Sequence, residues 1–343
     1  MPTDFDSRLK VFEIVDSHGV PGYVYLRLKY VLSKRKTDSE YVIKEYISRP
    51  NSVLSHNVYV TADVRKRTEI HGPSARITHL PYLNVTQPVD IDTVSCVRCL
   101  MWPTQARDWP TRHRNCGWPD SETVVRVVNN GCDVVGVAHS LCKDDEWMKK
   151  HQWRLPSSRA EVVLLNSWTS TQQIIYHMLR TFMKAERVIN CPKNSVTGKN
   201  PLSNYHVKTM MLWACEMKPL HWWTDRSNLI DLFVHCLYLL DEWISEKCGQ
   251  QHYFIKNAYL NNIDILSLDT VTALIKSVRE DCLTEWFIDN YMRKCAELCP
   301  ANVPILCSDM VTKDIIHDAA NAILKCKMPV FAKTLVNRYF VLP

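Results

Sequence analysis

Two pairs of aspartates have the residue type and spacing that metal-assisted chemistry uses. Asp4 and Asp6 precede a strand-like run, and Asp90 and Asp92 lie within another. Side chains two residues apart on a strand point to the same side, so each pair offers two carboxylates on one surface. Carboxylate oxygens suit Mg²⁺ or Mn²⁺, which orient a triphosphate and stabilise charge during phosphoryl transfer. Solvated acids near a chain end or a strand end show the same spacing and are the commoner case.

Cysteines form a second and weaker pattern. Cys96 and Cys99 make a single C-x-x-C, and His139 and Cys142 make a single H-x-x-C with Cys132 upstream. A structural zinc site needs four well-spaced ligands, and neither group has a clean second pair. We therefore interpret these residues as buried thiols that act as small hydrophobes, and we expect no zinc.

The elements that must position the acids are mostly strands. Polar and apolar residues alternate over residues 23–30, which predicts a half-buried strand with Val24, Leu26 and Leu28 on one face. Further strands are expected at 9–15, 74–83 and 89–100, with one helical stretch at 40–47. Residues 102–119 are rich in Pro and Trp and are expected to be irregular.

Beyond residue 153 the apolar period becomes helical. An apolar stripe over 174–183 follows the capping pattern Thr169-x-x-Gln172, and Ser158-x-x-Glu161 is a second capping pattern. Further helices are expected at 203–217, 228–245 and 269–282, and near 309–326. The sequence thus predicts an α+β protein with a sheet lobe over 1–150, a helical lobe over 151–343 and a cleft between them as the default ligand site.

The composition excludes several classes of function. Hydrophobic residues make up 46% of the chain, which is enough for a packed core, and the net charge of +6 is mild. Neither G-x-G-x-x-G nor G-x-x-x-x-G-K-[ST] occurs, which excludes dinucleotide-fold and P-loop mechanisms. The start of the chain is charged, and no apolar stretch approaches the ~20 residues of a membrane span. We therefore expect reduced thiols in a cytoplasmic or nuclear protein, with the cytoplasm favoured, and no membrane partner.

Several long motifs identify a family resemblance. WRLPSSRAE stands at 153–161, SNYHVKT at 203–209, LWACE at 212–216 and HYFI at 252–255. In sequence, order and spacing they resemble the male-abnormal-21 family, which includes cyclic GMP-AMP synthase and its receptor-like relatives in animals. The resemblance implies a bilobal nucleotidyltransferase, in which a mixed sheet carries three acids and a helical bundle closes over the nucleotide.

The resemblance also assigns site residues. Asp4 and Asp6 would be the first two Mg²⁺ or Mn²⁺ ligands, and Asp90 the third acid, placed to activate a ribose hydroxyl. Tyr205 matches the aromatic that stacks on a nucleotide base, although a Tyr that bridges two helices explains it equally well. Two further positions match the lining of the nucleotide pocket, Arg154 and Glu161; a helix-capping role accounts for Glu161 equally well.

Basic clusters are candidates for contacts with nucleic-acid phosphates. They are Lys34, Arg35 and Lys36 in one run and Arg180 and Lys184 on an expected helix. Taken singly, each cluster is better explained as a solvated turn or helix face, and a duplex-binding groove would require that they share one face.

The resemblance favours an enzyme that joins ATP and GTP into a cyclic dinucleotide in response to double-stranded RNA or DNA, as in innate immune sensing. Three departures keep the question of activity open. The chain contains no Gly-Ser pair, the family's bridging helix is missing, and Tyr176 stands where a triphosphate-binding lysine is expected. These departures imply an amino-terminally truncated form or a variant that makes no product. The alternative is a non-catalytic member of the family that acts as a nucleotide-binding or interaction module.

Overall fold

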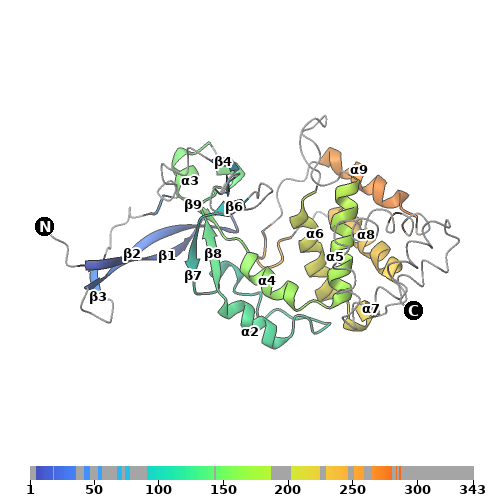
Figure 1. The fold of residues 1–343 in the computed structure, drawn as a ribbon, viewed down its shortest axis with the longest axis horizontal. Coiled ribbons are helices and arrows are strands. Elements are labelled where there is room, and N and C mark those ends of the chain that lie inside the picture. Colours follow the sequence, from blue (N-terminus) through green and yellow to red (C-terminus); the bar gives the residue numbers. More distant parts are fainter. Residues whose placement is uncertain are drawn as a thin grey trace, which may run out of the picture. The chain divides into compact units, whose positions relative to one another are not determined.

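The structure is a computed structural model, and it divides the chain into two compact units (Figure 1). The sheet unit comprises Met1–Thr111, Val125–Val162 and Phe254–Ala258, and the helical unit comprises Arg112–Val124, Val163–Tyr253 and Tyr259–Pro343. The residues that the structure describes are 5–17, 19–35, 42–46, 53–55, 68–71, 74–77, 91–142, 144–186, 202–224, 229–245, 251–258, 265–279, 283 and 286. Within these ranges, no helix has the length and apolar character needed to cross a lipid bilayer.

The main sheet of the sheet unit has six strands. Val24 and Leu26 of its long second strand are 0% and 1% exposed, so two of the three positions on the face predicted from the alternation at 23–30 are buried, and Leu28 is half-buried. Each strand pair in this sheet is antiparallel. The order is β1 (Phe5–Asp16), β2 (Tyr23–Arg35), β9 (Gln152–Arg154), β8 (Cys132–Val135) and β7 (Cys96–Cys99), and β3 (Val42–Tyr46) also pairs with β2.

A second sheet has three antiparallel strands, namely β4 (Thr68–His71), β5 (Ser74–Ile77) and β6 (Ile91–Val94). The strand expected over 89–100 is therefore two strands, because the chain leaves this sheet at Ser95 and enters the main sheet as β7. The parallel pairing that a mixed sheet requires is not among the strand pairs described.

The helix expected over 40–47 is wrong. Residues 42–46 form β3, in which Val42 and Ile43 are β-branched and Tyr46 is aromatic, and such residues favour strands. Pairing with β2 supplies the hydrogen bonds that a helix would have made internally. A tertiary partner therefore decided between two local structures that the sequence alone did not separate.

The helices expected over 203–217 and 228–245 are confirmed, and the helix expected over 269–282 is found at Ile265–Ser277. The helix expected near 309–326 lies outside the described residues. The predicted irregular segment 102–119 contains one short 3₁₀ helix, Thr104–Ala106.

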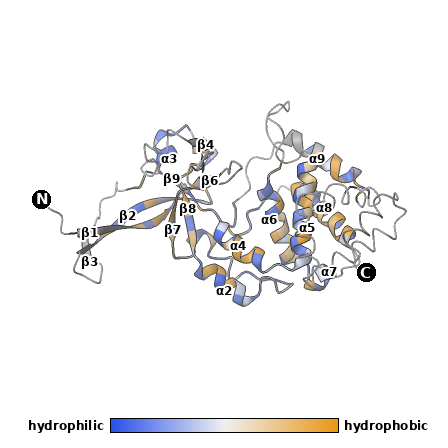
Figure 2. Cartoon of the chain, viewed as in Figure 1, coloured by the Kyte–Doolittle hydropathy of each residue, from blue (hydrophilic) through white to orange (hydrophobic). Residues whose placement is uncertain are grey.

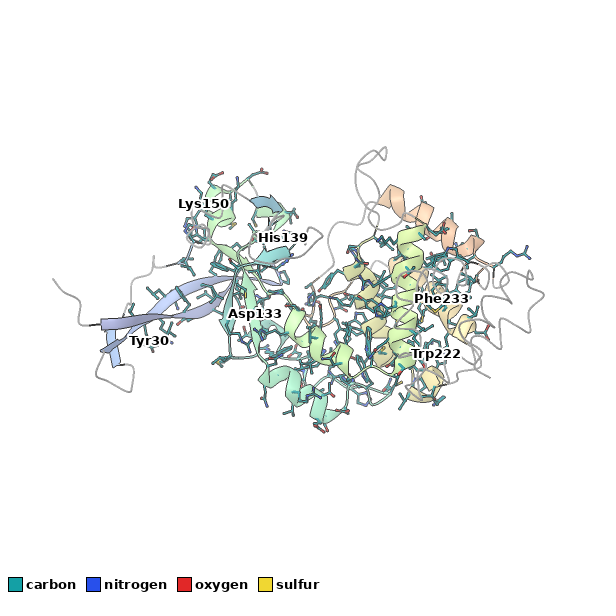
Figure 3. All side chains as sticks on the ribbon, viewed as in Figure 1. Tyr30, Asp133, His139, Lys150, Trp222 and Phe233 are labelled. Atoms are coloured by element: carbon teal, nitrogen blue, oxygen red, sulfur yellow. The ribbon has the colours of Figure 1, made fainter. Side chains whose placement is uncertain are left out.

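The stripe over 174–183 lies on α5 (Ser170–Ala185; coloured by hydropathy in Figure 2), where all its apolar residues except the half-buried Ile174 are buried. Phe182 packs against Phe233 of α8 (Leu229–Ser245), with ring centroids 5.7 Å apart; Phe233 is labelled in Figure 3. Helix α5 also packs on α6 (Asn204–Met217). The remaining bounds are α2 (Ser121–Asn129), α3 (Glu146–His151), α4 (Ser158–Asn166), α7 (Leu220–Thr224) and α9 (Ile265–Ser277).

One of the two predicted capping patterns is confirmed. Thr169 caps α5, since its backbone N–H donates to Gln172 Oε1 at 2.8 Å and its hydroxyl accepts from Gln172 N at 3.3 Å. The Ser158 pattern is wrong by one residue, because Ser158 is already helical and the N–H of Glu161 donates to the Ser157 carbonyl oxygen at 2.8 Å. The expected α+β class with a helical carboxy-terminal part is confirmed.

Candidate functional site

The first turn of α6 carries the polar residues of the SNYHVKT motif. Ser203 precedes the helix, and its backbone N–H donates to Nδ1 of His206 at 2.9 Å. Burial lowers the pKa of His206 to about 4, so the imidazole is neutral at pH 7 and its nitrogen can accept this bond. The cap fixes where α6 begins, and it thereby fixes the direction in which Tyr205 and Lys208 project.

Tyr205 lies at this helix start with its ring half-buried. The Lys208 ammonium lies 5.4 Å from the centroid of the Tyr205 ring, and the His252 ring lies 6.4 Å from it. Burial lowers the pKa of His252 to about 4, so this neighbour is uncharged at pH 7. The arrangement combines a partly accessible aromatic face with one adjacent cation, which is suited to a flat ring that carries an anionic group.

Helix α5 adds a second cation to this neighbourhood. Arg180 Nε donates to Oδ1 of Asn204 at 3.3 Å, and its guanidinium carbon lies 5.4 Å from the ring centroid of Tyr176. Tyr176 is only 8% exposed and packs edge-on against Trp168 at 5.4 Å. The Arg180 guanidinium therefore places a positive charge beside Tyr176, which stands where the family resemblance predicts a lysine. We call Arg180, Asn204, Tyr205, Lys208 and His252 the α6 start cluster.

The last turn of α6 carries a different and buried arrangement. Glu216 Oε2 accepts from Arg112 Nη2 at 2.5 Å and from the Tyr253 hydroxyl at 2.6 Å, and Arg114 Nε lies 3.6 Å away. The Arg112 guanidinium lies 4.5 Å from the ring centroids of both Trp213 and Tyr253. We call Arg112, Arg114, Trp213, Glu216 and Tyr253 the Glu216 cluster.

Burial governs the ionisation of the Glu216 cluster. It raises the pKa of the Tyr253 phenol and lowers that of the Arg114 guanidinium. One buried carboxylate thus pairs with two guanidinium groups and a phenol, and such an arrangement stabilises the packing of the segments that carry them. The sequence indicated Trp213, Glu216 and Tyr253 only as motif letters. Arg112 was missed because it lies in the irregular segment 102–119, where no period marks a buried residue.

The predicted metal ligands are only partly within the described residues. Asp4 and Asp90 lie outside them, as does Lys36, and of Asp6 only the backbone is described. Asp6 lies on β1 between Phe5 and Ser7. Phe5 and Ser7 pair with the consecutive residues Arg35 and Lys34 of β2, so Asp6 is the extra residue at a shift in the strand register. Bulges of this kind re-aim side chains and occur beside active sites. The register also brings Asp6 next to the backbone of two predicted phosphate-binding residues.

The described strands nearest in sequence to the predicted acids belong to two different sheets. Asp6 lies on β1 of the six-stranded sheet, whereas β6, which begins next to Asp90, belongs to the three-stranded sheet. Among the described residues, no three side chains of His, Cys, Asp or Glu gather at a spot that could hold a metal ion. The metal site with Asp4, Asp6 and Asp90 stays a prediction.

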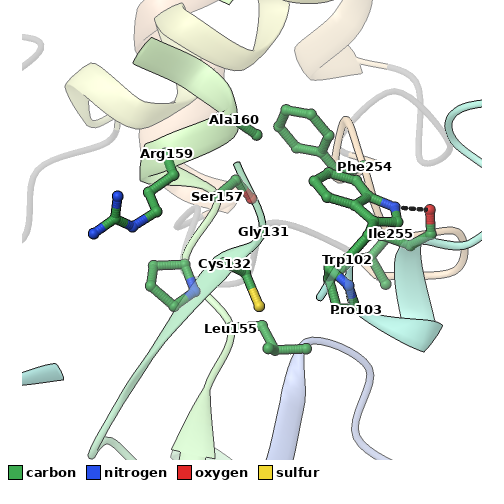
Figure 4. Close-up of a pocket in the computed structure, with 12 residues that line it drawn as sticks. Trp102, Pro103, Gly131, Cys132, Leu155, Ser157, Arg159, Ala160, Phe254 and Ile255 are labelled. Carbon is green, nitrogen blue, oxygen red and sulfur yellow. Dashed lines mark hydrogen bonds between the residues drawn. The ribbon is translucent and has the colours of Figure 1, made fainter. Parts of the chain in front are cut away.

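The two predicted pocket residues on either side of α4's start have contrasting surroundings. Arg154 is exposed at the end of β9, whereas Glu161 of α4 is 5% exposed. The chain between them lines a small cavity with Trp102, Cys132 and Phe254 (Figure 4). Its volume of about 20 Å³ admits one water-sized occupant, so a nucleotide does not fit in it. Lys184, the last predicted phosphate contact, is exposed on α5.

Comparison with protein-family models gives two matches. The Mab-21 protein nucleotidyltransferase domain matches residues 1–167, and the Mab-21 protein HhH/H2TH-like domain matches residues 171–280. The two matches follow each other without overlap and cover most of the chain. The first includes every predicted acid, and the second includes both ends of α6.

Proposed function

This chain belongs to the Mab-21 family, and from that premise we propose that it is a nucleotidyltransferase that joins ATP and GTP into a cyclic dinucleotide when it binds double-stranded RNA or DNA. The observation that carries the proposal is the match of residues 1–167 to the family's nucleotidyltransferase domain. The cyclic product and the response to a duplex are expectations from the motif resemblance.

In this proposal, the α6 start cluster binds one nucleotide. The half-buried Tyr205 ring offers a face for a base, and base–aromatic stacking contributes about 1–3 kcal/mol per base. Lys208 lies beside that ring and Arg180 lies over the Tyr176 ring, so two cations of the cluster are available to bind the phosphate groups. His252 adds no charge at pH 7, because its pKa is about 4.

The acids supply the other half of the chemistry. Asp4, Asp6 and Asp90 would provide an all-carboxylate donor set, which suits Mg²⁺ or Mn²⁺, and such ions when bound would neutralise charge on the triphosphate. Asp90 would accept the proton of the attacking ribose hydroxyl. Lys34 and Arg35, whose backbones pair beside Asp6, would contact phosphate groups of the triphosphate or of the duplex.

A product assay tests the proposal. Purified protein is incubated with labelled ATP and GTP, Mg²⁺ or Mn²⁺, and duplex RNA or DNA, and the products are separated by chromatography. We expect a phosphatase-resistant dinucleotide that forms only with metal and duplex, and that Asp6→Asn and Asp90→Asn abolish. Asp108→Asn is the matched control, because Asp108 is an exposed acid paired with Arg107, and this variant should keep its activity.

A second candidate is a non-catalytic nucleotide-binding module of the same family. It is favoured by Tyr176, which is buried against Trp168 at a position where the enzymes of the family place a phosphate-binding lysine. Triphosphate binding that Tyr205→Ala weakens, with no product under any of the above conditions, would support this candidate. The absence of both binding and product in a folded protein would contradict the two proposals together.

A further inference from the structure

Two cysteines face each other across neighbouring strands of the main sheet. Cys99, the last residue of β7, is the register partner of Cys132, the first residue of β8. Directly opposed residues on antiparallel strands have Cα atoms roughly 4.5–5.5 Å apart, and a disulfide requires about 4.4–6.8 Å. The backbone therefore already holds the two residues at a separation that a disulfide can span.

The two thiol groups approach the same backbone carbonyl oxygen. Cys99 Sγ is 3.4 Å from the carbonyl oxygen of Met101, and Cys132 Sγ is 3.7 Å from the same oxygen. The strands also approach closely here, since a Cβ atom at Gly131 would lie 2.4 Å from the Cys99 carbonyl oxygen. Arg98 braces this end of the ladder by donating to the carbonyl oxygens of Cys99 and Cys132, each at 3.1 Å.

The environments of the two thiols differ in a way that gives them different roles. A hydrogen bond from Cys132 lowers the pKa of Cys99 to about 6, which favours the thiolate form of Cys99. The same interaction and burial raise the pKa of Cys132, which stays protonated. Cys99 is half-exposed, and the next two residues, Leu100 and Met101, are 77% and 75% exposed, so a small oxidant reaches it from solvent.

We propose that Cys99 and Cys132 form a peroxide-responsive thiol pair that closes into a cross-strand disulfide. The Cys99 thiolate attacks one oxygen of hydrogen peroxide; the O–O bond breaks, Cys99 becomes a sulfenic acid, and the departing hydroxide takes up a proton to form water. The sulfur of Cys132 then loses its proton and attacks the Cys99 sulfur; the S–O bond breaks and water leaves. Two thiols are oxidised by two electrons, and one peroxide is reduced to two waters.

The disulfide would fix a part of the sheet unit that other contacts depend on. Asp133 follows Cys132 on β8, and its Oδ2 accepts from Arg159 Nε of α4 at 2.7 Å. Cys132 also lines the small cavity beside Leu155 and Pro156 (Figure 4). A covalent bond between β7 and β8 would therefore hold the strand end against which α4 begins. The pair is independent of the proposed transferase activity.

Mass spectrometry of the whole chain tests the proposal. The reduced protein is treated with hydrogen peroxide, its remaining thiols are alkylated, and peptides are mapped without reduction. We expect a loss of about 2 Da for the two hydrogens removed, and one cross-linked species joining the Cys99 and Cys132 peptides that dithiothreitol reverses. Cys96 is the internal control, because it is exposed on the same strand but lies opposite Val135, and it should remain fully alkylated.

Variants separate the two steps. Cys132→Ser should abolish the cross-link and leave a sulfenic acid on Cys99 that a dione probe traps, whereas Cys96→Ser should form the cross-link as the natural protein does. If Cys99 and Cys132 of the unaltered protein are alkylated equally with and without peroxide, or if either pairs with another cysteine, the proposal is overturned. This readout needs no variant, so a folding defect in Cys132→Ser does not weaken it.

Discussion

The two ends of helix α6 use similar residues in opposite ways. At its last turn, the buried Glu216 accepts hydrogen bonds from Arg112 and Tyr253, so its negative charge is paired inside the protein. At its first turn, the Tyr205 ring and the Lys208 side chain are half-buried and keep one side towards solvent. Both ends belong to the motifs that identify the family, and consecutive residues, His252 and Tyr253, contact the two ends.

The difference separates two reasons for which a motif residue can be present. Buried charge is costly unless it is paired, so the Glu216 cluster must be complete for the helical unit to have its full stability. A half-exposed ring with a cation beside it adds little to folding, and its value lies in what it can bind. Changes at the last turn should therefore alter stability, and changes at the first turn should alter binding.

The largest effect is expected at the last turn. Glu216→Gln leaves Arg112 and Arg114 without their shared counter-charge, and breaking a buried pair in this way costs about 3–5 kcal/mol of the free energy of unfolding. Urea denaturation followed by circular dichroism measures the loss. Glu242→Gln on the exposed face of α8 is the control and should change stability little. A stable Glu216→Gln variant would show that the cluster is not structural.

The next effect belongs to the first turn. Tyr205→Ala should weaken triphosphate binding about tenfold to a hundredfold, in keeping with the ~1–3 kcal/mol of one stacked base, while Tyr205→Phe keeps the ring and the affinity. Isothermal titration calorimetry measures both. Tyr238→Ala on α8 is the matched control, because that ring is 51% exposed and lies outside the cluster. Equal losses in the two alanine variants would remove Tyr205 from the proposed site.

A pH effect is expected from the cap of α6. The pKa of His206 is about 4 in the folded protein and near 6.5 in the unfolded chain, so below pH 6.5 the unfolded chain binds the proton more readily. The contribution of neutral His206 to the free energy of unfolding is fully present above pH 6.5 and is lost as the pH falls towards 4. At pH 5 the loss is about 1–2 kcal/mol. Urea denaturation at pH 7 and pH 5 measures this loss. His206→Asn, whose amide oxygen can still accept from Ser203, should reduce the pH dependence, and an unchanged dependence would contradict the assignment.

The smallest effect is expected when one of two lysines that lie beside aromatic rings is replaced. Lys208 lies 5.4 Å from the Tyr205 ring at the start of α6, and Lys218 lies 5.5 Å from the Trp222 ring just after its end. Lys208→Met should weaken triphosphate binding about threefold to tenfold, the ~1 kcal/mol of a partly exposed ionic contact, and the loss should shrink at high salt. Lys218→Met should leave the affinity unchanged. Equal effects would mean that the two ends of α6 do not differ in binding.

Local sequence patterns predicted the parts of the fold that local forces decide. The alternation at 23–30 gave β2, and the Thr169 pattern with the stripe after it gave α5 with its buried face. The helix at 40–47 failed because pairing with β2 outweighed the local preference, and no local signal marks the change of sheet at Ser95. Strand partners and sheet membership depend on contacts far apart in sequence.

The candidate site follows the same division. The motifs identified Tyr205 and its helix, and the structure adds the side chains that surround the ring, Lys208 and His252. Arg112 could not be predicted as a partner of Glu216, because the two stand on distant segments of the chain and the bond exists only after folding. Asp4 and Asp90 stay predictions from the family resemblance.

The path of the chain through the Glu216 cluster limits how this protein can be divided. The helical unit takes Arg112–Val124 from the middle of the sequence that otherwise builds the sheet unit, and Arg112 is the residue whose guanidinium contacts Glu216. A fragment that starts at residue 151 would keep the carboxylate and lose both arginines. The two units therefore cannot be exchanged between relatives by a single cut in the sequence. A chimera that joins this helical unit to a relative's sheet unit must also include Arg112 and Arg114.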